Sequence, residues 1–262
     1  MKALGIDVGS LNVKAVLLDG SGPQISTCLP AAEGAETAAK MAVQEIIRQA
    51  AIQQAETYIV ATGVGGKALT FSQQQKAITT CLARGVNRLF PAARMIIDMG
   101  AETSTVLKIN ERGRVTDWAG QDKCAAGTGM FVQAMAKVMQ VSLEQMAEYS
   151  LRATGKADIT GTCAVFAESE VISHIHRVPP TPKEDIIAGI HSSMVSRVMG
   201  LLKRLGIERE VAVVGGVARN KGLIAILEKE LGFTVLVPEN PEMVAALGAA
   251  ILARENLDKG LN

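Results

Sequence analysis

The sequence predicts an α/β protein built from two similar lobes. An N-terminal segment recurs roughly 90 residues later with the same order of apolar runs and glycine turns, which marks an internal repeat. Segments with helical spacing and short apolar runs alternate after each copy. The composition is that of a folded protein, since 48% of the 262 residues are hydrophobic and 20% are charged. A chain of this length can bury a core in each of two small lobes.

The two copies of the repeat begin in the same way. Each is an apolar run that ends in an aspartate followed by a glycine turn: Asp7 in the first copy and Asp98 in the second. A second strand follows the glycine turn, and a tight polar turn then leads into a third strand. These third strands are expected at 24–29 and 114–118.

Helices and buried strands follow each copy. The helices are expected at 36–51, 129–139, 164–176, 186–205, 220–231 and 244–255. Short buried strands are expected at 58–61, 211–214 and 235–237. Cys81 lies in a further segment expected to be helical, and Cys28 lies in a strand. We place the first lobe at 1–92, completed by a C-terminal helix within 241–262, and the second lobe at 93–240.

Charge and hydropathy exclude several classes of function. Lys and Arg number 27 against 26 Asp and Glu, so the chain is not a broadly basic binder of nucleic acid. Aromatic residues make up only 3%, too few for stacking platforms on single strands. Asp7 interrupts any signal-peptide core, and the most apolar stretch, 244–253, is too short to span a bilayer. We therefore expect a cytoplasmic protein with no nucleic-acid or membrane partner.

The first glycine turn has the composition of a phosphate-binding loop. Asp7 at a strand end can orient water on Mg²⁺, and Gly9 lets backbone N–H groups approach a phosphate. Ser10, Asn12 and Lys14 supply further donors. Taken alone, the segment is equally compatible with a hairpin turn capped by an aspartate.

The second copy strengthens the phosphate interpretation. Asp98 is followed by Gly100, Ala101, Glu102, Thr103 and Ser104. Two turns with one acid each could clamp a metal–triphosphate, with Asp7 and Asp98 organising Mg²⁺.

A third element combines a buried strand with a glycine turn and a helix. The strand at 211–214 runs into Gly215 and Gly216, and small residues such as Ala218 would let an adenosine lie against the backbone. Asn220 or the preceding arginine would stand near its edge. The sequence contains neither the G-x-G-x-x-G of a dinucleotide fold nor a Walker A loop.

In this order the three elements resemble the phosphate-1, phosphate-2 and adenosine motifs of the actin–hexokinase–heat-shock-chaperone ATPase superfamily. The resemblance covers nearly the whole chain. It implies two ribonuclease-H-like lobes with a nucleotide cleft between them. It also implies that further glycines and a threonine contribute to ATP binding: Gly127, Thr128, Gly129 and Gly248.

Two cysteines stand in small-residue loops just before expected helices. These are Cys124 and Cys163, and helix N-termini favour thiolates and anionic clusters. Two thiolates cannot complete an Fe–S cluster, which usually takes four, but two chains related by a twofold axis can. The alternative is that both are buried apolar cysteines. His191, on a helix, is expected to hydrogen-bond rather than to catalyse.

The wording around both cysteines resembles the activator ATPases of 2-hydroxyacyl-CoA dehydratases and the ATPase subunits of benzoyl-CoA reductases. The segments are Lys123–Gly129, with sequence KCAAGTG, and the stretch TCAVFAESEVI that starts at Thr162. The resemblance implies a homodimer, or half of a pseudo-symmetric heterodimer, with one 4Fe–4S cluster held by Cys124 and Cys163 of each subunit. It also implies anaerobic function, with ferredoxin or flavodoxin as the electron donor and an acyl-CoA dehydratase or reductase as the acceptor.

One loop departs from this family's pattern. The usual phosphate-2 loop reads Gly-Gly-Gln-Asp, whereas this chain has Gly100-Ala101-Glu102-Thr103. Thr103 cannot bind Mg²⁺ as an aspartate would, and Glu102 could orient or deprotonate the attacking water. A Gly-Ala start also occurs in one of the two types of benzoyl-CoA reductase ATPase subunit.

The leading hypothesis is an ATPase that couples ATP hydrolysis to one-electron transfer onto an acyl-CoA dehydratase. The first alternative is the ATPase subunit of a benzoyl-CoA reductase. A small-molecule kinase of the same superfamily and a non-enzymatic nucleotide sensor also stay open. A kinase gives no reason for Cys124 and Cys163, and the altered loop at Glu102 and Thr103 is what keeps the sensor open.

Overall fold

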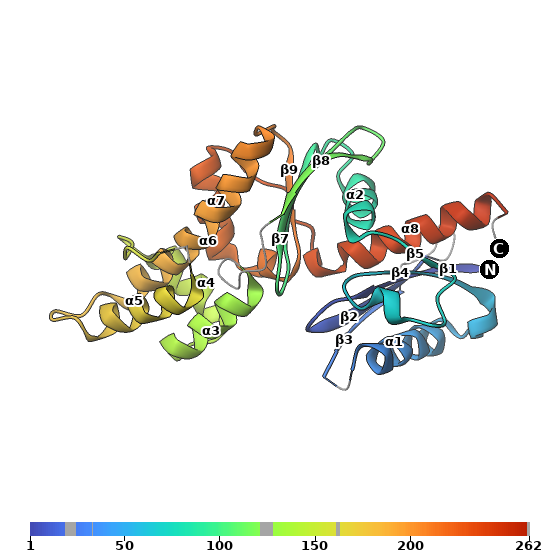
Figure 1. Cartoon of the computed structure of the whole chain (residues 1–262), viewed down its shortest axis with the longest axis horizontal. Helices are drawn as coiled ribbons and strands as arrows, with labels where there is room; N and C mark the ends of the chain where they lie inside the picture. The colour runs from blue at the N-terminus through green and yellow to red at the C-terminus, as the bar shows by residue number, and fades with distance from the viewer. Residues whose placement is uncertain (19–24, 33, 121–127, 161–162, 261–262) are drawn as a thin grey trace. The chain divides into compact units, whose positions relative to one another are not determined.

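The computed structural model describes residues 1–18, 25–32, 34–120, 128–160 and 163–260. The chain divides into two compact units (Figure 1). Unit 1 contains 1–93, 109–116 and 242–262, and unit 2 contains 94–108 and 117–241. Each unit is an α/β structure with its own sheet, so the predicted two-lobed α/β class is confirmed.

The sheet of unit 1 has five strands in the order β3-β2-β1-β4-β5. The strands are β1 (Lys2–Val8), β2 (Asn12–Leu18), β3 (Ile25–Pro30), β4 (Thr57–Thr62) and β5 (Gln74–Gln75). β1 pairs antiparallel with β2 and parallel with β4, which sets Asp7 opposite Lys14 on one side and Thr62 on the other. β1 is thus a central strand, and its carboxyl end carries the first motif aspartate.

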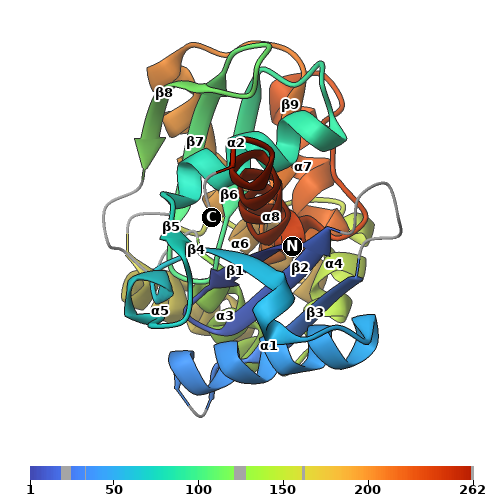
Figure 2. The same ribbon diagram turned by 90° about the vertical axis from the view of Figure 1, so that its right-hand side faces the viewer.

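Helices cover both faces of this sheet, as Figure 2 shows for α1 (Ala35–Ala50) and α8 (Val244–Asp258). The pleat sends alternate side chains of β1 to opposite faces. Leu4, Ile6 and Val8 pack in a cluster with α1, whereas Ala3 packs with α8. A strand covered on both faces is apolar throughout. This explains why β1 reads as a continuous apolar run.

The contacts of α8 depend on residues without side chains. Gly5 of β1 lies against the backbone of α8, where a Cβ would overlap Ala246 O and Ala250 N. Gly248 of α8 lies against the carbonyl of Cys81 in α2 (Ile78–Leu89), again with no room for a Cβ. These close approaches let α8 pack on the sheet and on α2 at the same time.

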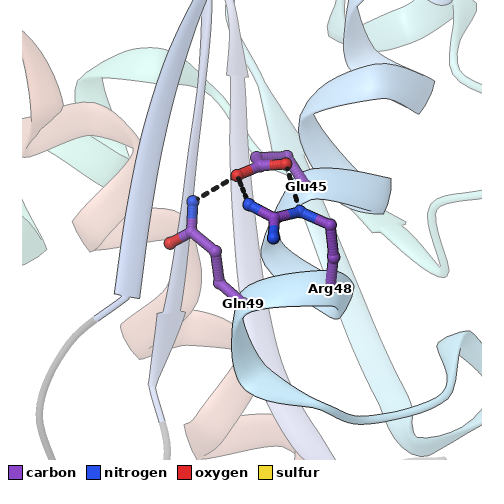
Figure 3. A network of polar contacts seen from close by, with 3 residues as sticks. All are labelled: Glu45, Arg48 and Gln49. Carbon is purple, nitrogen blue, oxygen red and sulfur yellow. Dashed lines mark hydrogen bonds and ion pairs between the residues drawn. The ribbon is translucent and has the colours of Figure 1, made fainter.

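The outer face of α1 carries a small polar network on its exposed surface (Figure 3). Arg48 donates from Nε and Nη2 to the two carboxylate oxygens of Glu45, at 2.9 and 2.6 Å, and Gln49 donates to Glu45 Oε1 at 2.6 Å. The Arg48 and Gln49 hydrogen bonds lower the pKa of Glu45 to about 2. Because these residues are three and four positions apart on one helix, they support the helix locally.

The sheet of unit 2 has four strands in the order β8-β7-β6-β9. They are β6 (Met95–Met99), β7 (Ser104–Ile109), β8 (Val115–Gly120) and β9 (Val211–Val214). β6 pairs antiparallel with β7 and parallel with β9, so Asp98 stands opposite Thr105 and Val214. The central strand β6 and its two neighbours therefore repeat the arrangement of β1, β2 and β4.

Five helices belong to unit 2 in the described part of the chain. They are α3 (Gly129–Met139), α4 (Leu143–Arg152), α5 (Ala164–His176), α6 (Lys183–Leu205) and α7 (Lys221–Leu231). One apolar cluster joins β6 and β9 to residues of α3, α5, α6 and α7. Met95, Ile97 and Met99 alternate along β6 and all belong to this cluster. The methionines of α3 at helical spacing are core residues as well.

Most expected elements are confirmed, with two exceptions. The strand expected at 235–237 is wrong: Leu236 forms a single bridge with Ala212, and its neighbours are only half-buried. Pro238 lacks an N–H donor and so cannot extend that pairing. Helix α4 was not expected, although Ser142 and Gln145 form a capping box at its start.

Among the described residues, no helix combines the length and the apolar character that crossing a membrane requires.

We predict that Gly248→Ala will destabilise the protein. The new methyl group has to displace the backbone of α2, and overpacking a filled core costs ~1–3 kcal/mol or more. Gly200→Ala is the matched control because Gly200 is also helical, is exposed and has open space where a Cβ would stand. It should stabilise by up to ~1 kcal/mol through helix propensity. Urea denaturation followed by circular dichroism measures both, and equal midpoints for the two variants would contradict the packing argument.

Candidate functional site

The first motif aspartate is buried and only half neutralised. Asp7 is 5% exposed at the end of β1. Lys14 Nζ lies 3.1 Å from Asp7 Oδ2. Asp7 Oδ1 is buried without a hydrogen-bond partner among the described residues. An unpaired carboxylate oxygen in a buried position is costly, so this atom is suited to a ligand such as water on a metal ion.

The backbone around Asp7 leaves no room for other side chains. Gly9 N donates to Asn12 O at 3.0 Å, which closes the turn between β1 and β2. A Cβ on Gly9 would stand 2.8 Å from Lys14 Nζ. Gly63, which follows β4, has φ +85° and approaches Asp7 Oδ1 so closely that a Cβ there would overlap it. Ser10 is exposed on this turn.

The second motif aspartate has the same surroundings. Asp98 is 8% exposed at the end of β6. Gly100 N donates to Thr103 O at 2.9 Å, which repeats the turn formed by Gly9 and Asn12. Gly215, which follows β9, has φ +88°, and a Cβ on it would stand 2.8 Å from Asp98 Oδ1 and overlap Met99 O.

Each unit therefore holds a buried aspartate between a glycine turn and a glycine of positive φ. The sequence analysis found the turns but missed Gly63. The segment at 61–66 is rich in glycine, and its place after a buried strand is the signal that could have identified it. Only glycine adopts such a conformation without strain, and only glycine fits beside the carboxylate.

The start of α3 is attached to the second loop. Gly129 N donates to Gly100 O and Met130 N donates to Ala101 O, both at 2.9 Å. Thr128 is the buried N-cap of α3. Gly127 lies outside the described residues. The loop that carries Asp98 is thus braced by a helix N-terminus, which also favours anions.

The remaining residues of the second loop differ in exposure. Glu102 and Thr103 are exposed, whereas Ser104 is buried as the first residue of β7. Glu102 can thus reach a ligand above the loop without paying for desolvation of its charge.

The expected adenosine motif forms a short 3₁₀ turn, η3 (Gly216–Arg219), between β9 and α7. A Cβ on Gly216 would meet nothing within 4 Å in the described structure, so this position is open. Ala218 is buried beneath the turn. Gly215 N donates to Pro241 O at 2.9 Å and anchors the turn. The backbone can therefore accept a flat group at Gly216.

Asn220 has a different position from the one expected of a nucleotide contact. Its Oδ1 accepts from Leu223 N at 3.0 Å as the N-cap of α7, and its Nδ2 lies 3.1 Å from His191 Nε2. His191 is fully buried on α6, and burial lowers its pKa to about 4. The expectation that His191 forms a hydrogen bond agrees with this contact.

Gly248 lies within α8, buried against α2. The contact with Cys81 accounts for the glycine without a nucleotide. We therefore leave Gly248 out of the nucleotide site proposed below.

The four cysteines have different environments. Cys163 is partly exposed as the N-cap of α5, and its carbonyl accepts from Ala167 N at 3.0 Å. Cys124 lies outside the described residues. Cys81 is buried, which raises the pKa of its thiol to about 12, and Cys28 is exposed on β3. Within the described ranges, no group of three or more His, Cys, Asp or Glu side chains is placed to hold a metal ion.

Glu170 of α5 braces the segment that leads to Cys163. Its Oε2 accepts a hydrogen bond from Thr160 N. The start of α5 thus presents a partly exposed thiol at a helix N-terminus, where a thiolate is favoured.

Comparison with known proteins agrees with this geometry. The chain is 38% identical over 255 residues to the 2-hydroxyisocaproyl-CoA dehydratase activator of Clostridioides difficile, which covers 97% of this chain and 95% of that protein. It is 36% identical over 258 residues to the (R)-2-hydroxyglutaryl-CoA dehydratase activating ATPase of Acidaminococcus fermentans, with 98% of each covered.

A solved structure matches over the same extent. The activator of the 2-hydroxyisocaproyl-CoA dehydratase from Clostridium difficile with bound ADPNP superposes with a TM-score of 0.91 at 35% identity, and the match covers 99% of this chain and 97% of that one. The neighbours in fold also include actin- and hexokinase-like ATPases with two lobes. Residues 4–253 match the model of the BadF/BadG/BcrA/BcrD ATPase family. The chain belongs to the BadF/BadG/BcrA/BcrD ATPase family.

Proposed function

We propose that this protein is an ATP-dependent activator that delivers a low-potential electron to a 2-hydroxyacyl-CoA dehydratase. ATP binding and hydrolysis follow from its family and from its relation to dehydratase activators. In this proposal two copies of the chain act together, and ferredoxin or flavodoxin supplies the electron. The acceptor is a partner enzyme, so the activator itself need not contact the CoA ester.

The observation that carries the nucleotide part is the half-neutralised carboxylate of Asp7. Lys14 lies beside one of its oxygens, and the other is buried without a partner in the described part of the chain. Magnesium prefers carboxylate oxygens and retains several waters, so Asp7 and Asp98 fit as groups that orient a hydrated Mg²⁺. Lys14 can reach a phosphate while it stays beside Asp7.

The backbone would hold the rest of the nucleotide. The turns at Gly9 and Gly100 expose N–H groups and lack side chains that would block a phosphate. Gly216 offers open space for the adenosine. Ser10, Asn12, Thr103 and Ser104 are the further donors that we assign to the phosphates.

The redox part rests on Cys163 and on the relation to the activators. Cys163 is partly exposed at the start of a 13-residue helix, an environment that suits a thiolate ligand. Cys163 and Cys124 of two copies would supply the four thiolates of one 4Fe–4S cluster. When bound, such a cluster supplies one-electron transfer at low potential. In this chain the α5 N-terminus and the Glu170 brace would hold the Cys163 thiolate in place.

A second candidate function is the ATPase subunit of a benzoyl-CoA reductase. The family that includes this chain is named after such proteins, and Ala101 follows Gly100 as in one type of reductase subunit. The two functions differ in their partners. Copurification with dehydratase subunits supports the first, whereas a permanent complex with a second, related ATPase supports the other.

We predict that Asp7→Asn weakens Mg-ATP binding by roughly tenfold or more. The variant keeps the shape of the side chain but removes the charge, and hydrogen bonds to charged groups contribute ~1.5–3 kcal/mol. Asp258→Asn, at the exposed end of α8, is the control and should bind like the wild type. Isothermal calorimetry measures both, and unchanged affinity in Asp7→Asn would remove this carboxylate from the site.

We predict that Cys163→Ser abolishes the cluster. Anaerobically purified wild-type protein should carry about four iron and four sulfide per dimer, and Cys163→Ser should carry almost none. Cys28→Ser changes an exposed cysteine on a distant strand of unit 1 and should keep the full iron content. Iron and sulfide analysis decides the assignment, which is wrong if Cys163→Ser retains a full cluster.

We predict that Glu102→Ala slows ATP cleavage while ATP affinity stays nearly intact. Water activation is needed only in the transition state, whereas the phosphates are held mainly by backbone N–H groups and Lys14. The loss of a water-positioning base typically lowers the rate by ~10²–10⁴-fold. Glu102→Gln should be milder because an amide can still orient water and is the family's usual residue here.

Single-turnover cleavage of ATP by both Glu102 variants, with calorimetric ATP affinities alongside, measures this effect. If Glu102→Ala cleaves ATP at the wild-type rate, the residue has no catalytic role and the water is activated elsewhere.

A further inference from the structure

The side chain of Asn220 is engaged at both ends. Its Oδ1 accepts from Leu223 N at 3.0 Å, and its Nδ2 lies 3.1 Å from His191 Nε2. The first contact caps α7 at its N-terminus. The second joins this cap to the middle of α6. Asn220 therefore links two helices of unit 2 through one amide group.

The cap fixes the protonation of His191. Because Oδ1 is the acceptor for Leu223 N, the group that faces His191 is the amide NH₂, which can only donate. Nε2 of His191 must therefore accept, and the imidazole is neutral with its proton on Nδ1. Protonation of Nε2 would set two donors against each other.

This arrangement has a cost. His191 is fully buried, and its Nδ1 has no hydrogen-bond partner in the described structure. A buried unpaired N–H costs ~1–3 kcal/mol. An apolar residue would avoid that cost at this position. The imidazole is therefore explained by the contact that its other nitrogen makes with Asn220.

Asn220 stands at the junction between η3 and α7. Its backbone N–H donates to Val217 O at 3.0 Å and closes the 3₁₀ turn, while its carbonyl accepts from Ile224 N at 3.1 Å in the first turn of α7. The open position Gly216 lies within the same turn. Any movement of Asn220 is thus transmitted directly to the backbone that faces the adenosine.

We propose that His191 is a positioning residue of the ATPase: through Asn220 it holds the η3 turn in the geometry that accepts the adenosine. His191 does not touch the nucleotide. The inference rests on the proposed nucleotide site at η3, and it assigns to Asn220 an anchoring role in place of a direct contact with ATP.

The first test compares Mg-ATP affinity in three variants. His191→Leu removes the acceptor and should raise the Kd roughly 3- to 10-fold, the effect expected from one hydrogen bond. His191→Gln can place an acceptor near the position of Nε2 and should restore the Kd to within about twofold. His176→Leu, which removes an exposed histidine on α5, should bind like the wild type.

A fourth variant keeps the proposal testable if His191→Leu fails to fold. Asn220→Ser retains a good N-cap but cannot reach His191, so it should weaken ATP binding as His191→Leu does. Adding His191→Leu to Asn220→Ser should cause no further loss because both remove the same link. Additive losses in the double variant would overturn the proposal.

Two readouts separate positioning from a purely structural role. Single-turnover cleavage at saturating ATP should stay within about twofold of the wild type, since only binding depends on the turn. If His191→Leu is folded and only its melting temperature falls, with the Kd unchanged, the proposal is wrong.

Nitrogen-15 NMR of the histidine side chains tests the protonation independently of ATP. The chain has three histidines, so the signals are few. His191 should carry its proton on Nδ1, and a proton on Nε2 would overturn the geometry. If the wild type does not bind ATP at all, the proposed function fails while this NMR result can still hold, so the two failures are distinguishable.

Discussion

Both units depend on the close approach of a glycine backbone to a buried aspartate at the end of a central strand. Asp7 and Asp98 are held between neighbouring strands, and the parallel neighbour turns away directly after pairing. Gly63 and Gly215 make that turn at positive φ, and a Cβ on either would press on the carboxylate. The parallel pairing, the turn and the position of the acid are therefore one constraint.

In unit 2 the same constraint also locates the expected adenosine turn. Gly215 flanks the Asp98 carboxylate and is the residue from which η3 begins. Its N–H is anchored on Pro241 O at one end, and Asn220 closes the turn at the other. A change in the surroundings of Asp98 is thus transmitted through two residues to the backbone at Gly216. Proximity of this kind couples phosphate chemistry to the grip on the base without a separate relay.

The internal repeat allowed the fold class and both carboxylate loops to be predicted from sequence, because two copies of a weak motif exclude coincidence. Packing decided the remaining positions. Gly63 was missed because nothing in its local pattern reveals a carboxylate from another strand. Gly248 was assigned to ATP, yet it is explained by a helix contact 167 residues away in sequence, at Cys81. Asn220 was recognised as important, but its partners depend on how α6 packs against α7.

The two loops share a backbone turn but differ in charge, and this difference divides their work. The register position opposite Asp7 is Lys14, whereas the position opposite Asp98 is Thr105. Counting along the turns, Leu11 of the first loop corresponds to Glu102 of the second. The first loop thus pairs its acid with a cation that can neutralise phosphate, while the second adds an exposed carboxylate. A cation belongs where charge is bound, and an extra carboxylate belongs where water is oriented. The phosphate grip is therefore assigned to the loop at Gly9, and water activation to the loop at Gly100.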